Sequence, residues 1–512
     1  MLSIIKTISL NGISGNLVEV QTDITGGLPN FEIVGLPDIS VRESKGRIRA
    51  AIKNSGIEFP SRKIIINLAP ASTKKEGTSY DLPIAIGVLL ALNEINKKGL
   101  ENTIFIGEVS LNGSINRING VLPMCIEAAN LGIKRVILPK ANEREAAVIK
   151  NLEIIGVSNL KEVIDYLNEK LNIEKTKIDI LKAFNKKEKE EFDFSEVKGQ
   201  ENVKRALEIA AAGGHNCILI GPPGAGKTMI AKRLPTILPD LTFEESLEVT
   251  KIHSVSGILD SRIGIVTKRP FRSPHHTISQ TSMIGGGRIP KPGEISLAHN
   301  GVLFLDELPE FNRSTLEVLR GPLEDKDITI SRLYSKVIYP SDFMLIASMN
   351  PCPCGYYGSN IKECKCSKQN IEKYLSKISG PLLDRIDLHV EIKPVRYEKL
   401  NSTAKVESSK QIKERVNRAR RIQYIRYKNL NIFSNSKLTP KLIEKYCYLN
   451  QECRKILELS FSKLGLSARA YTRILKVART IADLDEKENI EKQHIAEAIQ
   501  YRSLDRKYGD RF

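Results

Sequence analysis

Cys217-Ile218-Leu219-Ile220-Gly221-Pro222-Pro223-Gly224-Ala225-Gly226-Lys227-Thr228 decides the fold of the middle of this 512-residue chain. The four apolar residues predict a short buried strand, and the residues after Thr228 predict the first turns of a helix. The octapeptide between them has the pattern G-x-x-x-x-G-K-[ST], whose backbone N–H groups close around phosphates at a helix N-terminus. In this pattern Lys227 reaches the β- and γ-phosphates and Thr228 holds Mg²⁺. A glycine-rich turn without nucleotide is the alternative, but the flanks favour a nucleoside triphosphate site.

A second apolar strand ends in two acids about eighty residues later. Gly301 to Leu305 precede Asp306 and Glu307. Carboxylates at the end of an apolar strand are costly unless a cation is near. We therefore expect Asp306 to complete the Mg²⁺ shell and Glu307 to polarise the attacking water. A further apolar strand ends close to Asn350, whose amide is suited to orienting the same water.

The composition is that of a globular protein with room for about three domains. The longest apolar run, Pro83 to Leu92, is too short to cross a bilayer, and the first ten residues alternate like a strand rather than a signal peptide. Four of the eight cysteines crowd into one segment, which does not fit a disulfide framework. These features predict a cytoplasmic protein with no membrane partner.

Positive charge is concentrated at the C-terminal end. The net charge is +18, and the residues from Glu391 to Phe512 carry 28 Lys and Arg against 15 Asp and Glu, which is +13 of that total. A basic segment is expected of a protein that binds a phosphate backbone. A solvated surface explains the same charge equally well. Charge alone therefore leaves a nucleic-acid partner open.

Changes of pattern along the chain predict an α/β protein in four parts. The first alternates short strands with helices, the second is a Lys/Glu-rich linker, the third alternates strands and helices as in a parallel nucleotide-binding sheet, and the last has helical apolar spacing throughout. The predicted parts are residues 1–170, 171–191, 192–396 and 397–512.

Several motifs spread over nearly the whole chain accompany the phosphate loop. They are Phe194 to Gln200 (FSEVKGQ), Arg272 to Thr277 (RSPHHT), Pro292 to Asn300 (PGEISLAHN), Met349 to Gly355 (MNPCPCG), Ser379 to Asp387 (SGPLLDRID) and Ala478 to Leu484 (ARTIADL). Together they resemble an AAA+ ATPase of the magnesium-chelatase-like group, and more closely the ComM/YifB family. The resemblance implies ATP and Mg²⁺ as cofactors, an AAA+ P-loop core with a parallel sheet, and a C-terminal all-α lid.

The resemblance also implies roles for three further residues. Asn350 matches sensor 1, Arg385 matches the arginine finger that reaches into a neighbouring subunit's site, and Arg469 matches sensor 2 on the lid. An arginine that acts in trans implies a ring, so the expected partner is a second copy of the chain in a homohexamer. From the residues alone, Arg385 next to an acid also fits an ordinary intrachain ion pair.

The crowded cysteines form two C-x-C pairs, Cys352 with Cys354 and Cys364 with Cys366. Four thiolates within fifteen residues can converge on one tetrahedral Zn²⁺. The C-x-C spacing is tighter than the usual C-x₂-C, and reduced thiols in a loop or a redox-labile cluster remain alternatives. We expect a structural zinc that clips a long insertion. The other four cysteines are expected to be small buried hydrophobes.

Residues 69–83, 107–113 and 131–140 resemble segments of Lon-type proteases. Ser79 falls at the position of the protease serine, which needs a lysine as its base. Leu122 stands where that lysine would be, and leucine cannot accept a proton. We therefore predict a Lon-protease-like α+β N-terminal domain without peptidase activity; the alternative is that Lys74 or Lys75 substitutes as the base.

Other polar residues leave their roles open. Arg288 and Lys291 lie in a glycine-rich turn and fit either contact with a phosphate backbone or a plain surface hairpin. His275 and His276 are adjacent, so they do not easily share one metal ion, and a structural or interface role is favoured.

Three functions fit the sequence. A hexameric motor that remodels DNA, in branch migration as ComM proteins are held to do, is favoured by the ATP-site residues and the basic C-terminal part. A metal-insertion subunit like the magnesium-chelatase motor is less favoured because that motor is not expected to carry the Lon-like domain or the cysteine pairs. A protein-remodelling chaperone is the third.

Overall fold

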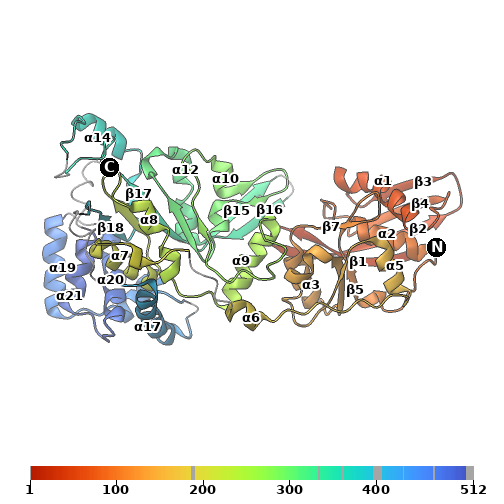
Figure 1. Cartoon of the computed structure of the whole chain (residues 1–512). Coiled ribbons are helices and arrows are strands. Elements are labelled where there is room, and N and C mark those ends of the chain that lie inside the picture. The colour runs from red at the N-terminus through yellow and green to blue at the C-terminus, as the bar shows by residue number, and fades with distance from the viewer. Residues whose placement is uncertain are drawn as a thin grey trace.

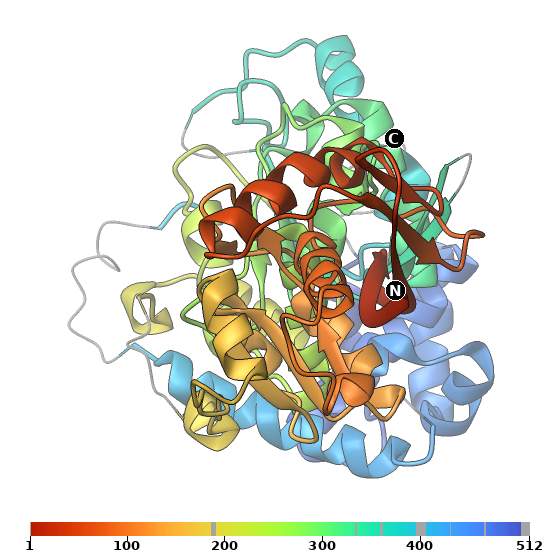
Figure 2. The ribbon, with the colours of Figure 1, turned by 90° about the vertical axis from the view of Figure 1, so that its right-hand side faces the viewer.

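The computed structural model describes residues 2–185, 191–332, 335–358, 362–395, 406–430, 432–464 and 467–502. The molecule is elongated, with the N-terminal sheet at one end and the C-terminal helices at the other (Figure 1). Figure 2 looks along this axis with the N-terminal elements nearest the viewer. The phosphate loop lies in the middle part.

The N-terminal part is built on a mixed seven-stranded sheet in the order β3-β4-β2-β1-β5-β8-β9. Its strands are β1 (Leu2–Asn11), β2 (Ser14–Thr25), β3 (Asn30–Val34), β4 (Lys63–Ala69), β5 (Thr103–Phe105), β8 (Arg135–Pro139) and β9 (Glu153–Val157), and a short hairpin pairs β6 (Glu108–Val109) with β7 (Ile115–Asn116). β2 pairs antiparallel with β1 and β4, and the other neighbours are parallel.

Helices cover both faces of this sheet. They are α1 (Ile39–Asn54), α2 (Asp81–Ala91), α3 (Val121–Asn130), α4 (Glu143–Ala146) and α5 (Leu160–Leu167). Alternate residues of the strands point to opposite faces: Ile5 packs with α1, α2 and α5, whereas Ile8 packs with α3 and α4. The alternation of strands and helices predicted for this part is confirmed.

The middle part contains a five-stranded parallel sheet in the order β11-β14-β17-β10-β18. The strands are β10 (Cys217–Ile220), β11 (Phe271–Arg272), β14 (Val302–Leu305), β17 (Met344–Met349) and β18 (Leu388–Glu391). β10, β14 and β17 are wholly buried, as expected of apolar strands covered on both faces. Because all five strands are parallel, their carboxyl ends share one edge, and the phosphate loop follows β10 at that edge.

Helices and two hairpins surround this sheet. The helices are α7 (Glu201–Gly213), α8 (Lys227–Ala231), α9 (Phe243–Ser256), α10 (Gln280–Ile284), α11 (Glu294–Leu297), α12 (Arg313–Glu317), α13 (Arg320–Asp325), α14 (Lys368–Leu375) and α15 (Gly380–Leu383). One hairpin pairs β12 (Gly285–Gly286) with β13 (Lys291–Pro292), and the other pairs β15 (Asp327–Arg332) with β16 (Ser335–Pro340).

Residues described from 406 to 502 form α17 (Ser409–Tyr427), α18 (Pro440–Tyr446), α19 (Gln451–Leu464), α20 (Ala468–Leu484) and α21 (Lys492–Gln500), with a short 3₁₀ turn at Asn435–Lys437. Ile412, Val416 and Ala419 of α17 are buried in one cluster with α7 and the sheet. Many basic side chains here are already paired: Arg415 contacts Glu208 and Glu407, and Arg426 contacts Asp483. These arginines are therefore held by carboxylates of the same chain, although the net charge of this part stays positive.

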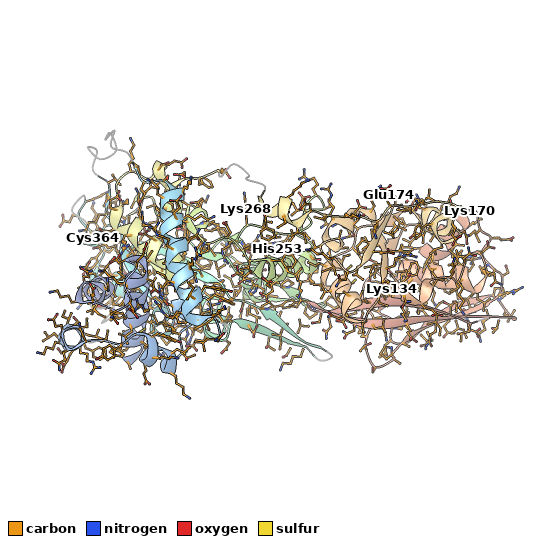
Figure 3. All side chains as sticks on the ribbon, turned by 90° about the horizontal axis from the view of Figure 1, so that it is seen from below. Lys134, Lys170, Glu174, His253, Lys268 and Cys364 are labelled. Carbon is orange, nitrogen blue, oxygen red and sulfur yellow. The ribbon has the colours of Figure 1, made fainter. Side chains whose placement is uncertain are left out.

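The N-terminal part docks on the middle part mainly through α3 and α9. The amide of Gly120 donates to the carbonyl of Ser254 over 3.1 Å, and Arg144 donates to the carbonyl of Arg262 over 3.1 Å. His253 of α9 is labelled in the middle of the elongated molecule in Figure 3. These contacts join segments more than a hundred residues apart in the sequence.

An apolar cluster completes this junction. Buried Leu122, Val148 and Ile265 form its centre, and side chains of α9 and of α6 (Ile180–Asn185), among them Leu247 and Phe184, pack against it. α6 lies within the segment predicted as an exposed helix or linker. Leu122, the residue predicted to stand at the position of the protease lysine, is thus part of the contact between the N-terminal part and the middle part.

Candidate ATPase site

The phosphate loop leaves the buried strand β10 and enters α8. Gly226 precedes α8 with φ +84° and Gly224 has φ +74°, a left-handed conformation that costs glycine little. Gly221 lies against the backbone just after β18, where an added Cβ would come within 2.6 Å of the carbonyl oxygen of Ile392. The predicted strand, loop and helix are confirmed in this order.

Lys227 is held by neutral oxygens. Its ammonium donates to the carbonyls of Gly221 and Pro222 over 2.7 and 3.0 Å and to Oδ1 of Asn350 over 2.9 Å. In the described part of the chain no carboxylate lies within ion-pair distance of it, and burial lowers its pKa. Asp306 and Glu307 act on this half-buried cation only from beyond contact distance, so a phosphate can bind it directly and the loop fits the phosphates of ATP.

Asp306 follows β14 and faces the loop. Its Oδ2 accepts from the hydroxyl of Thr228 over 2.5 Å, and its Oδ1 accepts from the hydroxyl of Ser348. A hydroxyl beside a carboxylate is the oxygen donor set that Mg²⁺ prefers. The two residues predicted to hold Mg²⁺ are therefore adjacent in the structure, and Ser348 is a neighbour that sequence reasoning missed.

Glu307 has an unusual backbone. Its φ is +54°, which is costly for a residue with a Cβ and is found most often at functional sites. Its side chain is 58% exposed, and Oε2 lies 3.9 Å from Nδ1 of His276. His276 in turn stacks on His275 with ring centroids 4.1 Å apart. The contact with Glu307 could not be inferred from the histidine pair, whose sequence signal was its place in the motif Arg272 to Thr277.

Arg385 lies at the opposite edge of the sheet. Its backbone carbonyl accepts from the side chain of Asn216, the residue before β10, over 3.0 Å, whereas the phosphate loop follows the other end of that strand. The guanidinium is 8% exposed and contacts Glu324 over 2.5 Å. Within its own chain Arg385 is therefore an ion-pair partner, and it is not brought to the phosphate loop.

Arg469 lies at the same edge as Arg385. It stands in the first turn of α20, is 62% exposed, and its nearest acid is Asp384 at 3.8 Å. Neither arginine joins the cluster of Lys227, Asp306 and Asn350. The predicted site residues thus divide into two groups at opposite ends of the parallel strands.

A buried polar network fastens α20 to this sheet. Asp387 accepts from Arg473 of α20, from the amide of Asn216 over 3.2 Å, and lies 3.3 Å from Nδ1 of His215. Nε2 of His215 lies 2.8 Å from the hydroxyl of Thr480, also in α20. Burial alone would raise the pKa of Asp387, but Arg473 and His215 hold it well below its usual range.

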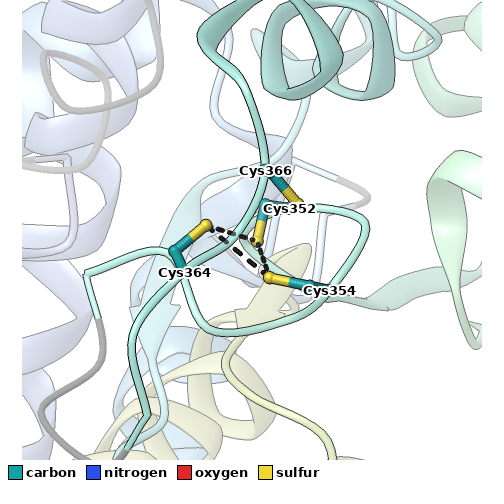
Figure 4. A group of neighbouring side chains, drawn as sticks. All are labelled: Cys352, Cys354, Cys364 and Cys366. Carbon is teal, nitrogen blue, oxygen red and sulfur yellow. Dashed lines mark hydrogen bonds between the residues drawn. The ribbon is translucent and has the colours of Figure 1, made fainter.

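The four clustered cysteines come together beside the site. Their Sγ atoms all lie within 4.8 Å of one another, and Figure 4 shows the four side chains gathered around one point. The other four cysteines are buried singly, as predicted. No other group of three or more His, Cys, Asp or Glu within reach of one metal ion occurs among the residues described.

The two hairpins of the middle part are joined. The hydroxyl of Tyr339 in β16 donates to the carbonyl of Pro290, in the turn between β12 and β13, over 2.8 Å. Arg288 and Lys291 of this turn and Lys336 of β16 are exposed. The turn predicted from its glycines is therefore a short hairpin that presents cations.

In the N-terminal part, Ser79 is nearly buried and Lys75 is fully buried. Lys75 donates to the carbonyls of Pro70 and Thr73, and Lys74 pairs with Glu76 over 2.5 Å. Neither lysine makes a described contact with the Ser79 hydroxyl.

Models of one protein family match three segments of the chain. "Magnesium chelatase, subunit ChlI" matches residues 193–400, "Subunit ChlI of Mg-chelatase" residues 20–142, and "Magnesium chelatase, subunit ChlI C-terminal" residues 406–502. The protein YifB of Escherichia coli K12 is 45% identical over 509 residues, 99% of this chain and 98% of YifB. The chain belongs to the ComM/YifB family. The competence protein ComM of Haemophilus influenzae is 42% identical over 508 residues, covering 98% of both chains.

This ComM/YifB member also has a more distant relative that matches only part of the chain. Lon protease 2 of Bacillus subtilis is 30% identical over 172 residues, 30% of each chain. As a member of the magnesium-chelatase-like group, the chain is an AAA+ ATPase motor. The family implies the use of ATP and Mg²⁺, and its members usually form oligomers. Among the described helices, none has the length and apolar character needed to span a membrane.

Proposed function

We propose that this protein is a ring-forming ATPase, a homohexamer that hydrolyses ATP between neighbouring subunits and applies the resulting motion to DNA. The observation that carries the ATPase assignment is the half-buried Lys227, bound only to neutral oxygens beside the paired Asp306 and Thr228. Assembly into a ring and action on DNA are each supported by other residues.

The residues of one chain supply the binding half of the site. Bound Mg²⁺ neutralises charge on the β- and γ-phosphates and makes the terminal phosphoryl group easier to transfer. Thr228 and Asp306 hold the cation, and the loop amides with Lys227 hold the phosphates. Asn350 keeps the Lys227 ammonium in place, and Glu307 at the exposed end of β14 orients the attacking water.

A neighbouring chain supplies the other half. Arg385 and Arg469 lie at the sheet edge opposite their own phosphate loop, so they are suited to stabilising charge on a nucleotide held by the next subunit. In such a head-to-tail contact each subunit binds the next one in the same way, and the series of subunits ends only when it closes into a ring. The family's usual oligomerisation supports the same arrangement.

DNA is supported as the substrate by the joined hairpins. Arg288, Lys291 and Lys336 project from two hairpins that Tyr339 ties together, and exposed cations of this kind bind a phosphate backbone. The paired arginines of α17 contribute less, because their charges are already neutralised. One full-length relative is named a competence protein, which agrees with a role on DNA.

The ATPase half is tested by the rate of ATP hydrolysis in Lys227→Ala. Lys232→Ala is the matched control, since Lys232 is exposed just after α8. We expect Lys227→Ala to lose at least about 99% of the activity and the control to keep it. Equal rates in both variants would exclude the phosphate loop as the site.

The DNA half is tested by stimulation of the same rate with single-stranded or duplex DNA. The double variant Arg288→Ala/Lys291→Ala should bind DNA more weakly and with a salt slope reduced by about one to two. Lys97→Ala/Lys98→Ala removes two exposed lysines of the N-terminal domain and should change neither. Stimulation by an unfolded protein or a porphyrin, and none by DNA at low salt, would instead support the chaperone or metal-insertion function.

The N-terminal domain is proposed to be proteolytically silent. Leu122 cannot act as a base, and the nearby lysines bond to backbone carbonyls and to Glu76. Casein should remain uncut in the presence of ATP. Cleavage that disappears in Ser79→Ala would contradict this proposal.

A further inference from the structure

The four clustered cysteines have the geometry of a metal site. Cys352 and Cys354 follow β17, and Cys364 and Cys366 lie just before α14, so the two pairs come from the two ends of one loop (Figure 4). Cys352 lies 3.3 Å from Cys354 and 3.7 Å from Cys364, and Cys354 lies 3.6 Å from Cys364, all between Sγ atoms.

These separations match a tetrahedron of thiolates around zinc. A Zn–S bond of about 2.3 Å places two tetrahedral ligands about 3.8 Å apart. A disulfide requires about 2.05 Å instead. The set contains only cysteine, and four soft thiolates favour Zn²⁺ over Mg²⁺ or Ca²⁺.

The cysteine loop touches the phosphate loop. Gly355, directly after Cys354, lies so close to Pro223 that a Cβ added to it would meet Cδ of that proline at 2.3 Å and Cγ at 2.8 Å. Gly355 also has φ +84° and donates its amide to the carbonyl of Cys352 over 2.9 Å. The backbone between the cysteines is thus a direct support for the proline side of the phosphate loop.

A second contact reaches the other end of the same loop. Asn350 is two residues before Cys352, and its Oδ1 accepts from the ammonium of Lys227 over 2.9 Å. Residues 350 to 355 therefore contact both Pro223, near the start of the phosphate loop, and Lys227, at its end. Fixing Cys352 and Cys354 on a metal fixes both contacts at once.

We infer that the four cysteines bind one Zn²⁺ and that this ion keeps the phosphate loop in its nucleotide-binding conformation. The second half rests on the proposed role of that loop in binding ATP. Without the metal, the four cysteines are joined only by weak sulfur contacts, so the segment from Asn350 to Gly355 loses its anchor. When the metal already holds this segment against the phosphate loop, less conformational entropy is lost as the loop becomes ordered around a nucleotide.

The metal is tested first and independently of nucleotide. The full-length protein, purified under reducing conditions without chelator, should contain about one equivalent of zinc by mass spectrometry, and Cys364→Ser/Cys366→Ser less than about a tenth. Cys453→Ser is the control, because Cys453 is buried alone and donates to the carbonyl of Ile490, as a serine can. Less than a tenth of an equivalent in the unaltered protein, even after zinc is added, would overturn the site.

The support of the phosphate loop is tested by Gly355→Ala, which leaves all four cysteines in place. This variant should keep its zinc and bind a fluorescent ATP analogue at least about tenfold more weakly. Gly132→Ala is the control, since Gly132 also has a positive φ, of +72°, but no atom lies within 4 Å of an added Cβ.

The possible results separate the two proposals. Weaker binding in Gly355→Ala and in Cys364→Ser/Cys366→Ser, with normal binding in both controls, supports the inference. Normal affinity in Gly355→Ala would overturn the support of the loop even if zinc is present. Absence of nucleotide binding in the unaltered, zinc-loaded protein would refute the ATP site itself, and the coupling with it.

Discussion

Replacing Leu122 by lysine restores the residue type that Lon-type proteases use as a base, yet we predict that it disrupts the protein instead of activating it. Leu122 is fully buried between Val148 and Ile265, at the junction of the N-terminal domain with α9 and α6. The Leu122→Lys side chain would place an ammonium in this apolar contact.

The cost follows from the protonation of that lysine. An unperturbed lysine has a pKa of about 10.4, so keeping the amine neutral at pH 7 costs about 4.6 kcal/mol, at about 1.36 kcal/mol per pH unit. This is comparable with the whole stability of a typical domain, about 5–15 kcal/mol. Because a buried lysine has a lowered folded pKa, the unfolded state binds more protons, and the penalty should fall by about 1.4 kcal/mol for each unit that the pH rises above 7.

The assay is the first thermal transition followed by circular dichroism at several pH values, together with casein cleavage. Leu131→Lys is the matched control, since Leu131 ends the same helix α3 and is 44% exposed; it should stay within about 0.5 kcal/mol of the unaltered protein. The reasoning would be refuted if Leu122→Lys were as stable as this control, or if it cleaved casein in a manner that depends on Ser79.

Three further predictions concern the ATP site and its support. Glu307→Gln should bind ATP with nearly normal affinity but turn over about 10²–10⁴-fold more slowly; normal turnover would exclude its role in orienting water. Arg385→Ala and Lys227→Ala should each be inactive in ATP hydrolysis, whereas an equal mixture should regain activity at about one site in four because the intact halves meet across subunits; a mixture as inactive as its parents would contradict the trans role. Asp387→Asn should lower stability by about 3–5 kcal/mol, since it leaves Arg473 without its buried partner. Because Arg473 and His215 hold the pKa of Asp387 below its usual range, the difference from the unaltered protein should persist above about pH 4 and shrink as the pH falls below it, which chemical denaturation at pH 7 and pH 3 would detect.

Local patterns in the sequence were sufficient to predict that Lys227, Asp306 and Asn350 lie at one edge of the sheet. A run of apolar residues such as Cys217–Ile220 or Val302–Leu305 can only be buried, and parallel strands bring the polar residues at their carboxyl ends to one edge. Lys227, Asp306 and Asn350 therefore had to lie close together. Local apolar patterns of the same kind predicted that strands and helices alternate in both the N-terminal and the middle part.

Contacts between distant segments could not be predicted, because no local pattern encodes them. Gly355 against Pro223, and His276 near Glu307, each depend on how a loop returns to the sheet. Likewise, the missing base at Leu122 was visible in the sequence, but its burial against α9 was not. The ion pairs of Arg415 and Arg426 could not be predicted either, since a net charge does not reveal which cations have an acidic partner.

In the proposed ring, the position of Arg385 links assembly to nucleotide binding. Alone, the chain keeps this guanidinium 8% exposed and bound to Glu324, whose own side chain is 54% exposed. An ion pair with one well-solvated partner is worth at most about 1 kcal/mol, whereas a hydrogen bond to a charged group such as a phosphate contributes about 1.5–3 kcal/mol. A nucleotide on the neighbouring subunit can therefore draw Arg385 away from Glu324, and a subunit without such a neighbour keeps it covered. Since the two events favour each other, ATP should tighten the contact between subunits by the same factor that the contact tightens ATP binding.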